Sequence, residues 1–135
     1  MRIERCQYLR DKGWYAGPWD SKLAVSIGYA HVGVDEPHLH TRIQEVYLIA
    51  CGSCRVRVEQ ETACLTVGDV LIVEPGEAHT FLEHSSDYFH FVIHVPGLAG
   101  EEARTEKLLV GRSWLEDRSA QERPKPPSQE PGEGR

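Results

Sequence analysis

Three histidines and one glutamate are spaced along this chain in a way that only a strongly curled β-sheet could bring together. His38 and His40 project from the same face of an extended strand, with Cα atoms about 6.6 Å apart. Glu45 would return from the next strand, and His79 would arrive from a distant strand behind a Pro75-Gly76 turn. The four side chains therefore meet only if the sheet closes into a barrel.

This set of side chains suits a divalent transition metal. Three imidazoles and one carboxylate are ligands of intermediate hardness, appropriate for Fe(II), Mn(II), Ni(II), Cu(II) or Zn(II). On an octahedral ion they would leave two positions open for water, a chelating substrate or dioxygen. The other interpretation places the histidines on a surface loop or in hydrogen bonds within the core. It would be preferred for one histidine, but the spaced set favours a metal site of unknown metal identity.

The segments around these residues resemble the two sequence motifs of the cupin superfamily. The first motif spans residues 33–52 and the second spans residues 68–79, and the resemblance covers residues 23–96. It implies an all-β protein of the small single-domain (monocupin) type, with a double-stranded β-helix or jelly-roll barrel. By position, the metal ligands of the family match His38, His40, Glu45 and His79.

One departure from the second motif adds a carboxylate four residues after the last histidine. Glu83 stands where the family commonly has asparagine, and at a period of two it would share a face with His79 and Phe81. We therefore expect Glu83 near the barrel mouth, as a candidate for proton transfer. Tyr47 has the same parity as Glu45 and is the second candidate catalytic residue.

The composition is that of a small acidic domain. The 135 residues carry a formal net charge of -6 with a pI of about 5.6, and the length fits one domain. The chain has no run of lysine or arginine, which argues against nucleic-acid binding, and its acidic balance disfavours anionic membranes. No apolar stretch approaches the ~18 residues of a spanning helix, and the N-terminus lacks the apolar region of a secretory signal. We therefore expect a cytoplasmic protein.

The four cysteines fit that expectation. Cys51 and Cys54 form a CxxC pair, but they lie in a predicted turn rather than at a helix N-terminus, where such thiols become reactive. Cys6 and Cys64 do not supply the second pair that a zinc site of this type needs. We interpret the cysteines as buried or turn-packed free thiols.

The chain divides into three parts. Residues 1–22 are aromatic and rich in turns, and predict an arm that packs on the barrel, either across a dimer interface or as a lid of the same chain. Residues 23–110 form the barrel, in which 101–109 are a short helix or a last strand. From residue 117 to 135 the chain is rich in proline and glutamate, which predicts a disordered tail.

For two predicted strands, the sequence does not decide which face points into the barrel. Residues 23–30 alternate large and small side chains, and either set could line a cavity. In residues 88–95, His90 and His94 share one face, and the opposite face is more apolar and is expected to form the core. If the histidine face points inward instead, one of them could support the metal ligands or act as a general base.

These observations lead to a functional expectation with two alternatives. The cupin resemblance implies a metal-dependent enzyme acting on a small polar metabolite, of the dioxygenase or sugar-isomerase and epimerase type. The aromatic arm leaves a homodimer open as the assembly. The first alternative is a non-catalytic module that binds or senses a small molecule such as a sugar on its metal. The second is a barrel whose metal serves stability alone. Fold does not decide among them.

Overall fold

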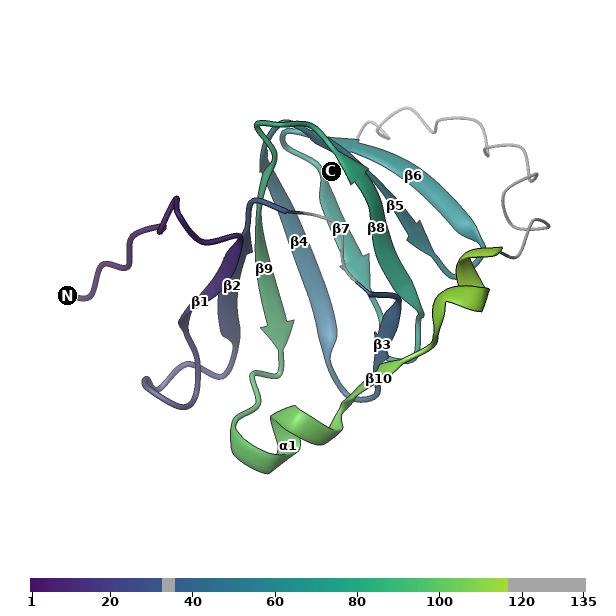
Figure 1. The fold of residues 1–135 in the computed structure, drawn as a ribbon. Coiled ribbons are helices and arrows are strands. Elements are labelled where there is room, and N and C mark those ends of the chain that lie inside the picture. Colours follow the sequence, from purple (N-terminus) through teal and green to yellow (C-terminus); the bar gives the residue numbers. More distant parts are fainter. Residues whose placement is uncertain (33–35, 117–135) are drawn as a thin grey trace, which may run out of the picture.

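The computed structural model describes residues 1–32 and 36–116, and the predicted tail at 117–135 lies outside this range. Within the described residues the strands form two five-stranded antiparallel sheets that face each other (Figure 1). The first sheet holds, in spatial order, β1 (Lys12–Ala16), β2 (Ser26–Ala30), β9 (Phe89–Val95), β4 (Gln44–Cys51) and β7 (Val70–Val73). The second holds β10 (Lys107–Leu109), β3 (His38–His40), β8 (His79–His84), β5 (Ser53–Val58) and β6 (Glu61–Thr66). This arrangement confirms the predicted two-sheet β-barrel.

The space between the sheets changes from polar to apolar along the strands. On β4 the buried side chains are Glu45, Tyr47 and Ile49, in steps of two. Tyr47 and Ile49 belong to the apolar core, and on β8 Phe81 belongs to it as well. Each of these strands therefore begins at the polar cluster and continues into the core.

The small face of β2 points into the barrel. Ser26, Gly28 and Ala30 pair with His94, Val92 and His90 of β9, all of which line the cavity between the sheets. Directly paired residues of an antiparallel sheet share a face, so small side chains on β2 leave room at this position. The strand begins at Ser26, three residues later than the alternating pattern suggested.

Strand β9 corrects one expectation. His90 is buried and both His90 and His94 line the cavity, so the histidine face points inward. The more apolar face points outward and is covered by aromatic rings: Phe89 packs against Tyr29, and Phe91 against Tyr15. The apolar content of a face does not identify the inside of the barrel when both faces are covered.

A β-bulge in β8 breaks the period of two on which the position of Glu83 depended. Phe81 pairs with Val56 of β5, but Glu83 pairs with the adjacent Arg55, so Leu82 is an extra residue on β8. Glu83 is consequently on the outer side, where its carboxylate accepts a hydrogen bond from Arg55 Nε at 2.9 Å. Its side chain is 68% exposed.

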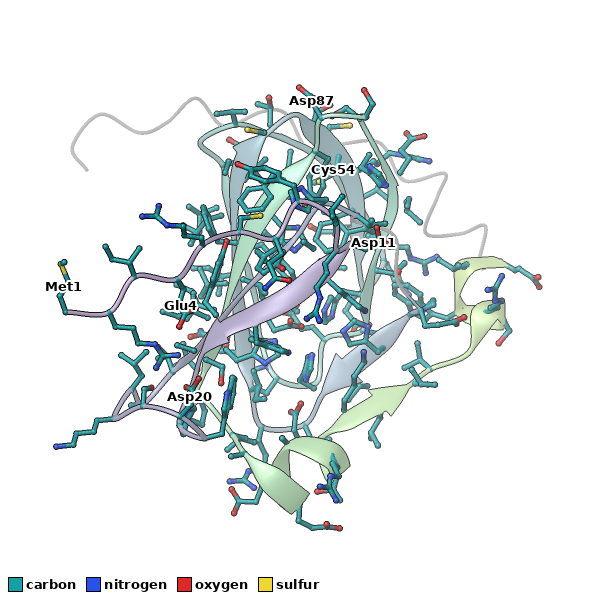
Figure 2. The ribbon with its side chains drawn as sticks, turned by 60° about the vertical axis from the view of Figure 1, so that its left-hand side comes forward. Met1, Glu4, Asp11, Asp20, Cys54 and Asp87 are labelled. Carbon is teal, nitrogen blue, oxygen red and sulfur yellow. The ribbon has the colours of Figure 1, made fainter. Side chains whose placement is uncertain are left out.

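The segments before and after the central strands each add an edge strand. The N-terminal segment contacts its own barrel, since residues 12–16 pair with β2. Within the segment, Arg2 donates to the Asp20 carboxylate at 2.8 Å. Figure 2 shows this side, with Asp11 at the start of β1 and Asp20 beyond its end. Residues 100–109 form both predicted elements, a helix α1 (Gly100–Thr105) and the strand β10, which pairs with β3.

A short 3-10 helix, η1 (Arg112–Glu116), ends the described chain. It places Trp114 over the buried Arg57 guanidinium, 4.0 Å from the ring centroid. Of the helices in the described ranges, none has the length and apolar character required to cross a bilayer.

Candidate metal centre

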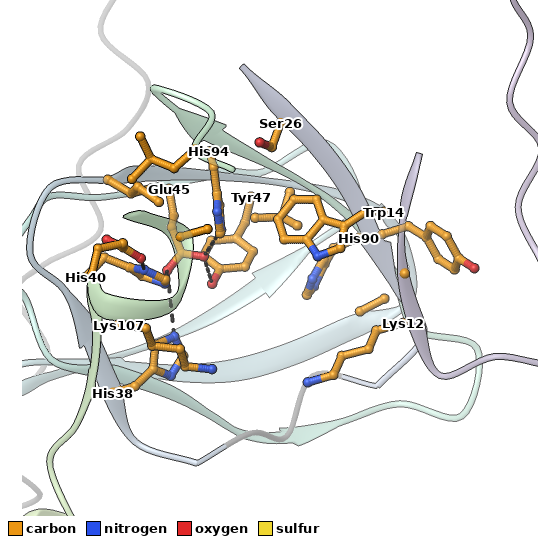
Figure 3. Close-up of a pocket in the computed structure, with 18 of the residues that line it drawn as sticks. Lys12, Trp14, Ser26, His38, His40, Glu45, Tyr47, His90, His94 and Lys107 are labelled. Carbon is orange, nitrogen blue, oxygen red and sulfur yellow. Dashed lines mark hydrogen bonds and ion pairs between the residues drawn. The ribbon is translucent and has the colours of Figure 1, made fainter. Parts of the chain in front are cut away.

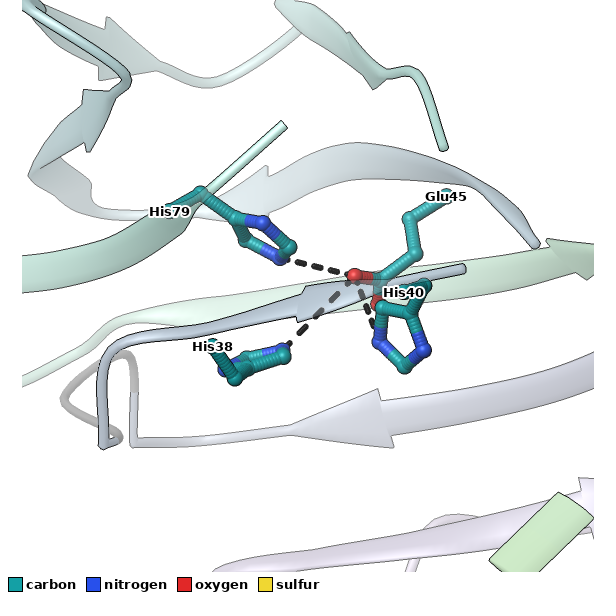
Figure 4. Close-up of side chains that lie close together, drawn as sticks. All are labelled: His38, His40, Glu45 and His79. Atoms are coloured by element: carbon teal, nitrogen blue, oxygen red, sulfur yellow. Dashed lines mark ion pairs between the residues drawn. The ribbon is translucent and has the colours of Figure 1, made fainter. Parts of the chain in front are cut away.

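The predicted ligands come together in one buried cluster. His38 and His40 are on β3, Glu45 is near the start of β4, and His79 begins β8. Their ligand atoms all lie within 4.8 Å of one another (Figure 4), and all four residues are buried. His38 and His79 are direct neighbours across the β3–β8 pair, which explains how residues far apart in sequence meet.

One oxygen of Glu45 lies at the centre of this cluster. Glu45 Oε1 is 2.7 Å from His79 Nε2, 2.9 Å from His40 Nε2 and 3.8 Å from His38 Nε2. Yet within the described residues this buried oxygen makes no hydrogen bond of acceptable geometry. Buried polar atoms are nearly always paired, so an orphaned carboxylate oxygen facing three ring nitrogens fits a bound cation.

The second nitrogen of each ligand histidine indicates which ring nitrogen is available. His38 Nδ1 lies 2.8 Å from the backbone oxygen of Glu36, and His79 Nδ1 lies 3.0 Å from that of Glu77. Carbonyl oxygens only accept hydrogen bonds, so each neutral ring carries its proton on Nδ1. The Nε2 lone pairs then point into the cluster, as metal coordination requires.

His40 has a carboxylate partner that the sequence did not indicate. Its Nδ1 contacts the Oε1 atom of Glu106, a buried residue between α1 and β10. Burial alone would lower the pKa of His40, but the Glu45 and Glu106 carboxylates outweigh it and raise the pKa. Glu106 belongs to neither motif and is one of several acidic residues in its segment. Nothing in the sequence therefore distinguishes it as a partner of His40.

The other oxygen of Glu45 is held by two donors. Tyr47 Oη donates to Glu45 Oε2 at 2.8 Å, and His94 Nε2 donates to the same atom at 2.9 Å. Burial alone would raise the pKa of Glu45, but hydrogen bonds to its carboxylate, that of His94 among them, outweigh burial and hold the pKa well below its ordinary value. Glu45 is therefore ionised, with Oε2 occupied and Oε1 left for an ion.

The structure separates the two residues predicted to be catalytic. Tyr47 reaches the cluster: besides bonding Glu45, its hydroxyl lies 3.5 Å from His79 Nε2. Glu83 is not brought to the cluster, because the bulge in β8 turns it to the outer surface. His94, whose role depended on which face of β9 is inward, reaches Glu45 directly.

A cavity of about 810 Å³ opens beside the cluster (Figure 3). His38, His40 and Glu45 form part of its wall, so an ion bound there would be accessible to a small molecule. Aromatic and aliphatic side chains form much of the rest, with a few polar groups among them, which is typical of small-molecule sites. The apolar and aromatic wall includes Trp14, Trp19, Tyr47, Phe81 and Val92.

His90 lies deeper in the same wall. Its Nδ1 atom is 2.5 Å from the Tyr88 hydroxyl, and its ring packs against Tyr47 and Phe81. Burial lowers the pKa of His90 to about 4, against a weaker opposing attraction from the Glu45 charge. His90 is therefore a neutral side chain at physiological pH.

The cysteines are free thiols, but Cys64 is neither buried nor in a turn as expected, because it lies on the exposed side of β6. Cys51 and Cys64 are exposed, Cys54 is buried in the core and Cys6 is partly buried. In the described part of the chain, the cluster of His38, His40, Glu45 and His79 is the one group whose geometry could hold a metal ion. The CxxC pair is not part of it.

The fold and the buried histidine–glutamate cluster define a small cupin protein. The chain belongs to the family of AraC-like ligand-binding domains, whose family model matches residues 25–125. No curated protein sequence matches it.

Several solved structures share the fold at low sequence identity. KdgF from Halomonas sp. is 18% identical over 63% of this chain and 78% of its own, with a TM-score of 0.55. Streptomyces Pac13 with uridine is 14% identical over 74% and 77%, with a TM-score of 0.59. A Cupin 2 conserved barrel domain protein from Salinispora arenicola is 11% identical over 70% and 88%, with a TM-score of 0.57. At these identities the similarity concerns the fold.

Proposed function

We propose that this protein is a metal-dependent enzyme that acts on a small polar molecule bound in the cavity. One divalent transition-metal ion would be held by His38, His40, Glu45 and His79. The observation that carries this proposal is the orphaned Glu45 Oε1, surrounded by three Nε2 atoms whose rings are fixed through Nδ1. A further support is that Pac13, which has a similar fold, is described as a nucleoside dehydratase.

Each residue of the cluster has a separate task in this proposal. The bound metal would supply a Lewis acid with open coordination positions toward the cavity. Glu45 and the three imidazoles hold the ion, and Tyr47 and His94 keep Glu45 oriented through its other oxygen. Tyr47 is also the best-placed group to give or take a proton beside the ion, since its hydroxyl lies near both Glu45 and His79.

The reaction type follows from the metal and the substrate. Iron would favour dioxygenase chemistry, since it activates dioxygen at an open position. Manganese, nickel or zinc would favour isomerase or epimerase chemistry, in which the ion polarises a carbonyl or hydroxyl of a chelated substrate. Both reaction types need a substrate that reaches the ion, and the cavity beside the cluster provides that access.

A non-catalytic binding module is the second candidate. The family of AraC-like ligand-binding domains favours it, because the name of the family describes binding rather than catalysis. In this case the metal would anchor a small molecule without changing it. Stoichiometric binding with no product, for every metal that fills the site, would favour this candidate over the enzyme.

We also propose that the protein forms a homodimer through the outer face of the first sheet. Val70 and Ile72 on the edge strand β7 are exposed, and they pair with Leu48 and Val46 on β4. These apolar side chains would be covered by a second copy. Sedimentation should give a dimer for the natural sequence and a monomer for Ile72→Lys.

The first experiment is elemental analysis of protein purified without a histidine tag, with a His38→Ala/His40→Ala variant as the control. About one equivalent of iron, manganese or nickel, lost in the variant, would support the site. Zinc alone would support the site and leave the enzyme and binding candidates to be separated by turnover. No metal after reconstitution would contradict the proposal.

A further inference from the structure

We propose that the cavity takes an anion with a flat ring, an aromatic or heteroaromatic acid, whose acid group lies beside the metal and whose ring lies against Trp14. This inference rests on the metal site proposed above and adds the class of compound. Its main support comes from β1, whose residues 12–16 all precede the segment that matches the family model.

Trp14 forms a wall of the cavity because a glycine faces it. Trp14 pairs with Gly28 of β2, and a Cβ atom at Gly28 would lie 2.9 Å from the indole Cε3 atom and 2.9 Å from the Gly13 backbone oxygen. Only glycine therefore lets the indole lie this close to β2. Trp14 lines the cavity, and the residue remains 50% exposed, so part of its side chain is open to a ligand.

Trp14 is also connected to the metal cluster, through one intervening side chain. Its ring lies 4.7 Å from the His94 ring, at an interplanar angle of 70°. His94 in turn donates to Glu45 Oε2. One side chain therefore separates the indole from a metal ligand, and a small compound that chelates the ion extends toward Trp14.

Two lysines make the same space favourable for an anion. Lys107 pairs with the ligand His40 across β10 and β3, so it flanks the metal cluster. Lys12 is two residues before Trp14 and lines the cavity from the other side, as Figure 3 shows. Asp11, Glu45 and Glu106 also line the cavity, but Glu45 belongs to the metal cluster and Glu106 is engaged with His40. With the metal charge added, the local balance favours a negative group even though the whole chain is acidic.

The requirement for a flat ring follows from the shape of this wall. Ring pairs gain energy beyond the area that they bury, and an open indole offers that gain to a planar aromatic group. Beside β1 in the same sheet, Ser26 and Ala30 of β2 also line the cavity, and their small side chains leave space next to the indole. A saturated ring with the same acid group would bury apolar area but lose this part of the interaction.

Three probe compounds test separately what the flat ring and the negative charge contribute to binding. Salicylate has a flat ring and an acid next to a hydroxyl that can chelate a metal. The saturated analogue, 2-hydroxycyclohexanecarboxylate, keeps the acid and hydroxyl and loses the flat ring, and salicylamide keeps the ring and loses the charge. Isothermal titration of the metal-loaded full chain should rank salicylate as the tightest of the three.

Variants assign the effect to the named residues. Trp14→Leu should weaken salicylate about three- to tenfold and weaken the saturated analogue less, and Trp14→Phe should keep most of the affinity. Lys107→Gln should weaken salicylate several-fold, most at low salt, and leave salicylamide unchanged. Lys22→Gln, a change at an exposed lysine away from the cavity, is the control and should bind as the natural sequence does.

The possible failures are distinguishable. Equal affinity for salicylate and its saturated analogue, or equal weakening of both by Trp14→Leu, overturns this inference while metal content leaves the proposed function standing. If the protein takes up no metal but still prefers salicylate in a Trp14-dependent way, the metal site is wrong and the ring site stands. Trp14→Phe keeps an aromatic ring and serves as the control for misfolding. If this variant has an unchanged circular dichroism spectrum but no longer prefers salicylate over its saturated analogue, the inference is also contradicted.

Discussion

The N-terminal strand β1 and the C-terminal strand β10 occupy equivalent places and contribute different chemistry. Each adds an edge strand, to opposite sheets, and each lies beside the cavity. The C-terminal segment buries Glu106 against the ligand His40, whereas β1 presents the half-exposed Trp14 to the cavity. Residues outside the two motifs therefore have different roles in the two segments. One segment supports a residue of the proposed metal site, and the other forms part of the cavity wall.

The largest expected effect is a pH-dependent loss of stability that comes from His90. This residue belongs to neither edge segment and therefore serves as a reference for both. The ordinary pKa of histidine is about 6.5, and in the folded barrel burial lowers the pKa of His90 to about 4. As the pH falls from 7 to 4, the unfolded chain takes up a proton and the folded chain resists it, so stability decreases. The expected loss from this residue is on the order of 3 kcal/mol by pH 4.

Urea unfolding at both pH values measures this loss. The His90→Gln variant has no titrating side chain at this position. Its stability should therefore fall less between pH 7 and pH 4 than that of the natural sequence. Identical decreases in the two proteins would show that His90 is not buried as a neutral side chain.

Loss of Glu106 should produce the next largest effect, and only on the metal. Glu106→Ala leaves His40 Nδ1 without its carboxylate, and losing such a partner lowers metal affinity by about 10- to 100-fold. Glu106→Gln keeps an acceptor oxygen and should lose less. Competition with a chelator gives the dissociation constants. Glu102→Gln, on the exposed side of α1, is the matched control. Equal losses of metal affinity in Trp14→Leu and Glu106→Ala would contradict the different roles assigned to the two segments.

Gly28→Ala should act on β1 with little effect at the metal. The added Cβ would collide with the Trp14 ring and the Gly13 backbone oxygen, so β1 must shift. Such crowding costs about 1–2 kcal/mol of stability. Hydrogen exchange should show faster exchange in residues 12–16, with unchanged metal affinity. A loss of metal affinity with no change in β1 would contradict the division of roles.

Glu83→Gln should have the smallest effect of the series. The Arg55–Glu83 pair is exposed on the outer side of the second sheet, and such pairs contribute about 0.5 kcal/mol or less. We expect unchanged turnover and a nearly unchanged unfolding midpoint. Tyr47→Phe is the contrasting variant, since it removes a donor to Glu45 and should lower turnover. Reduced turnover in Glu83→Gln would extend the functional surface beyond the cavity.

Much of the fold and the metal cluster could be predicted from local patterns. The spacing of His38 and His40 determines a shared strand face at any position in a sheet, and turn residues such as Gly76, with a positive φ of 86°, mark where strands end. Parity arguments failed where the period of two was interrupted. The extra residue Leu82 in β8 turned Glu83 outward, and nothing in the sequence around it marks a bulge.

The sequence by itself predicted the all-β architecture and the histidine–glutamate cluster, because these depend on side-chain chemistry and on short repeats along the chain. Only the tertiary structure decided which face of β9 is inside, that Glu106 supports His40, and that Trp14 stands over the cavity. Those features depend on contacts between distant segments, such as that of His40 with Glu106, 66 residues apart. Local periodicity carries no information about which distant segment will cover a given face.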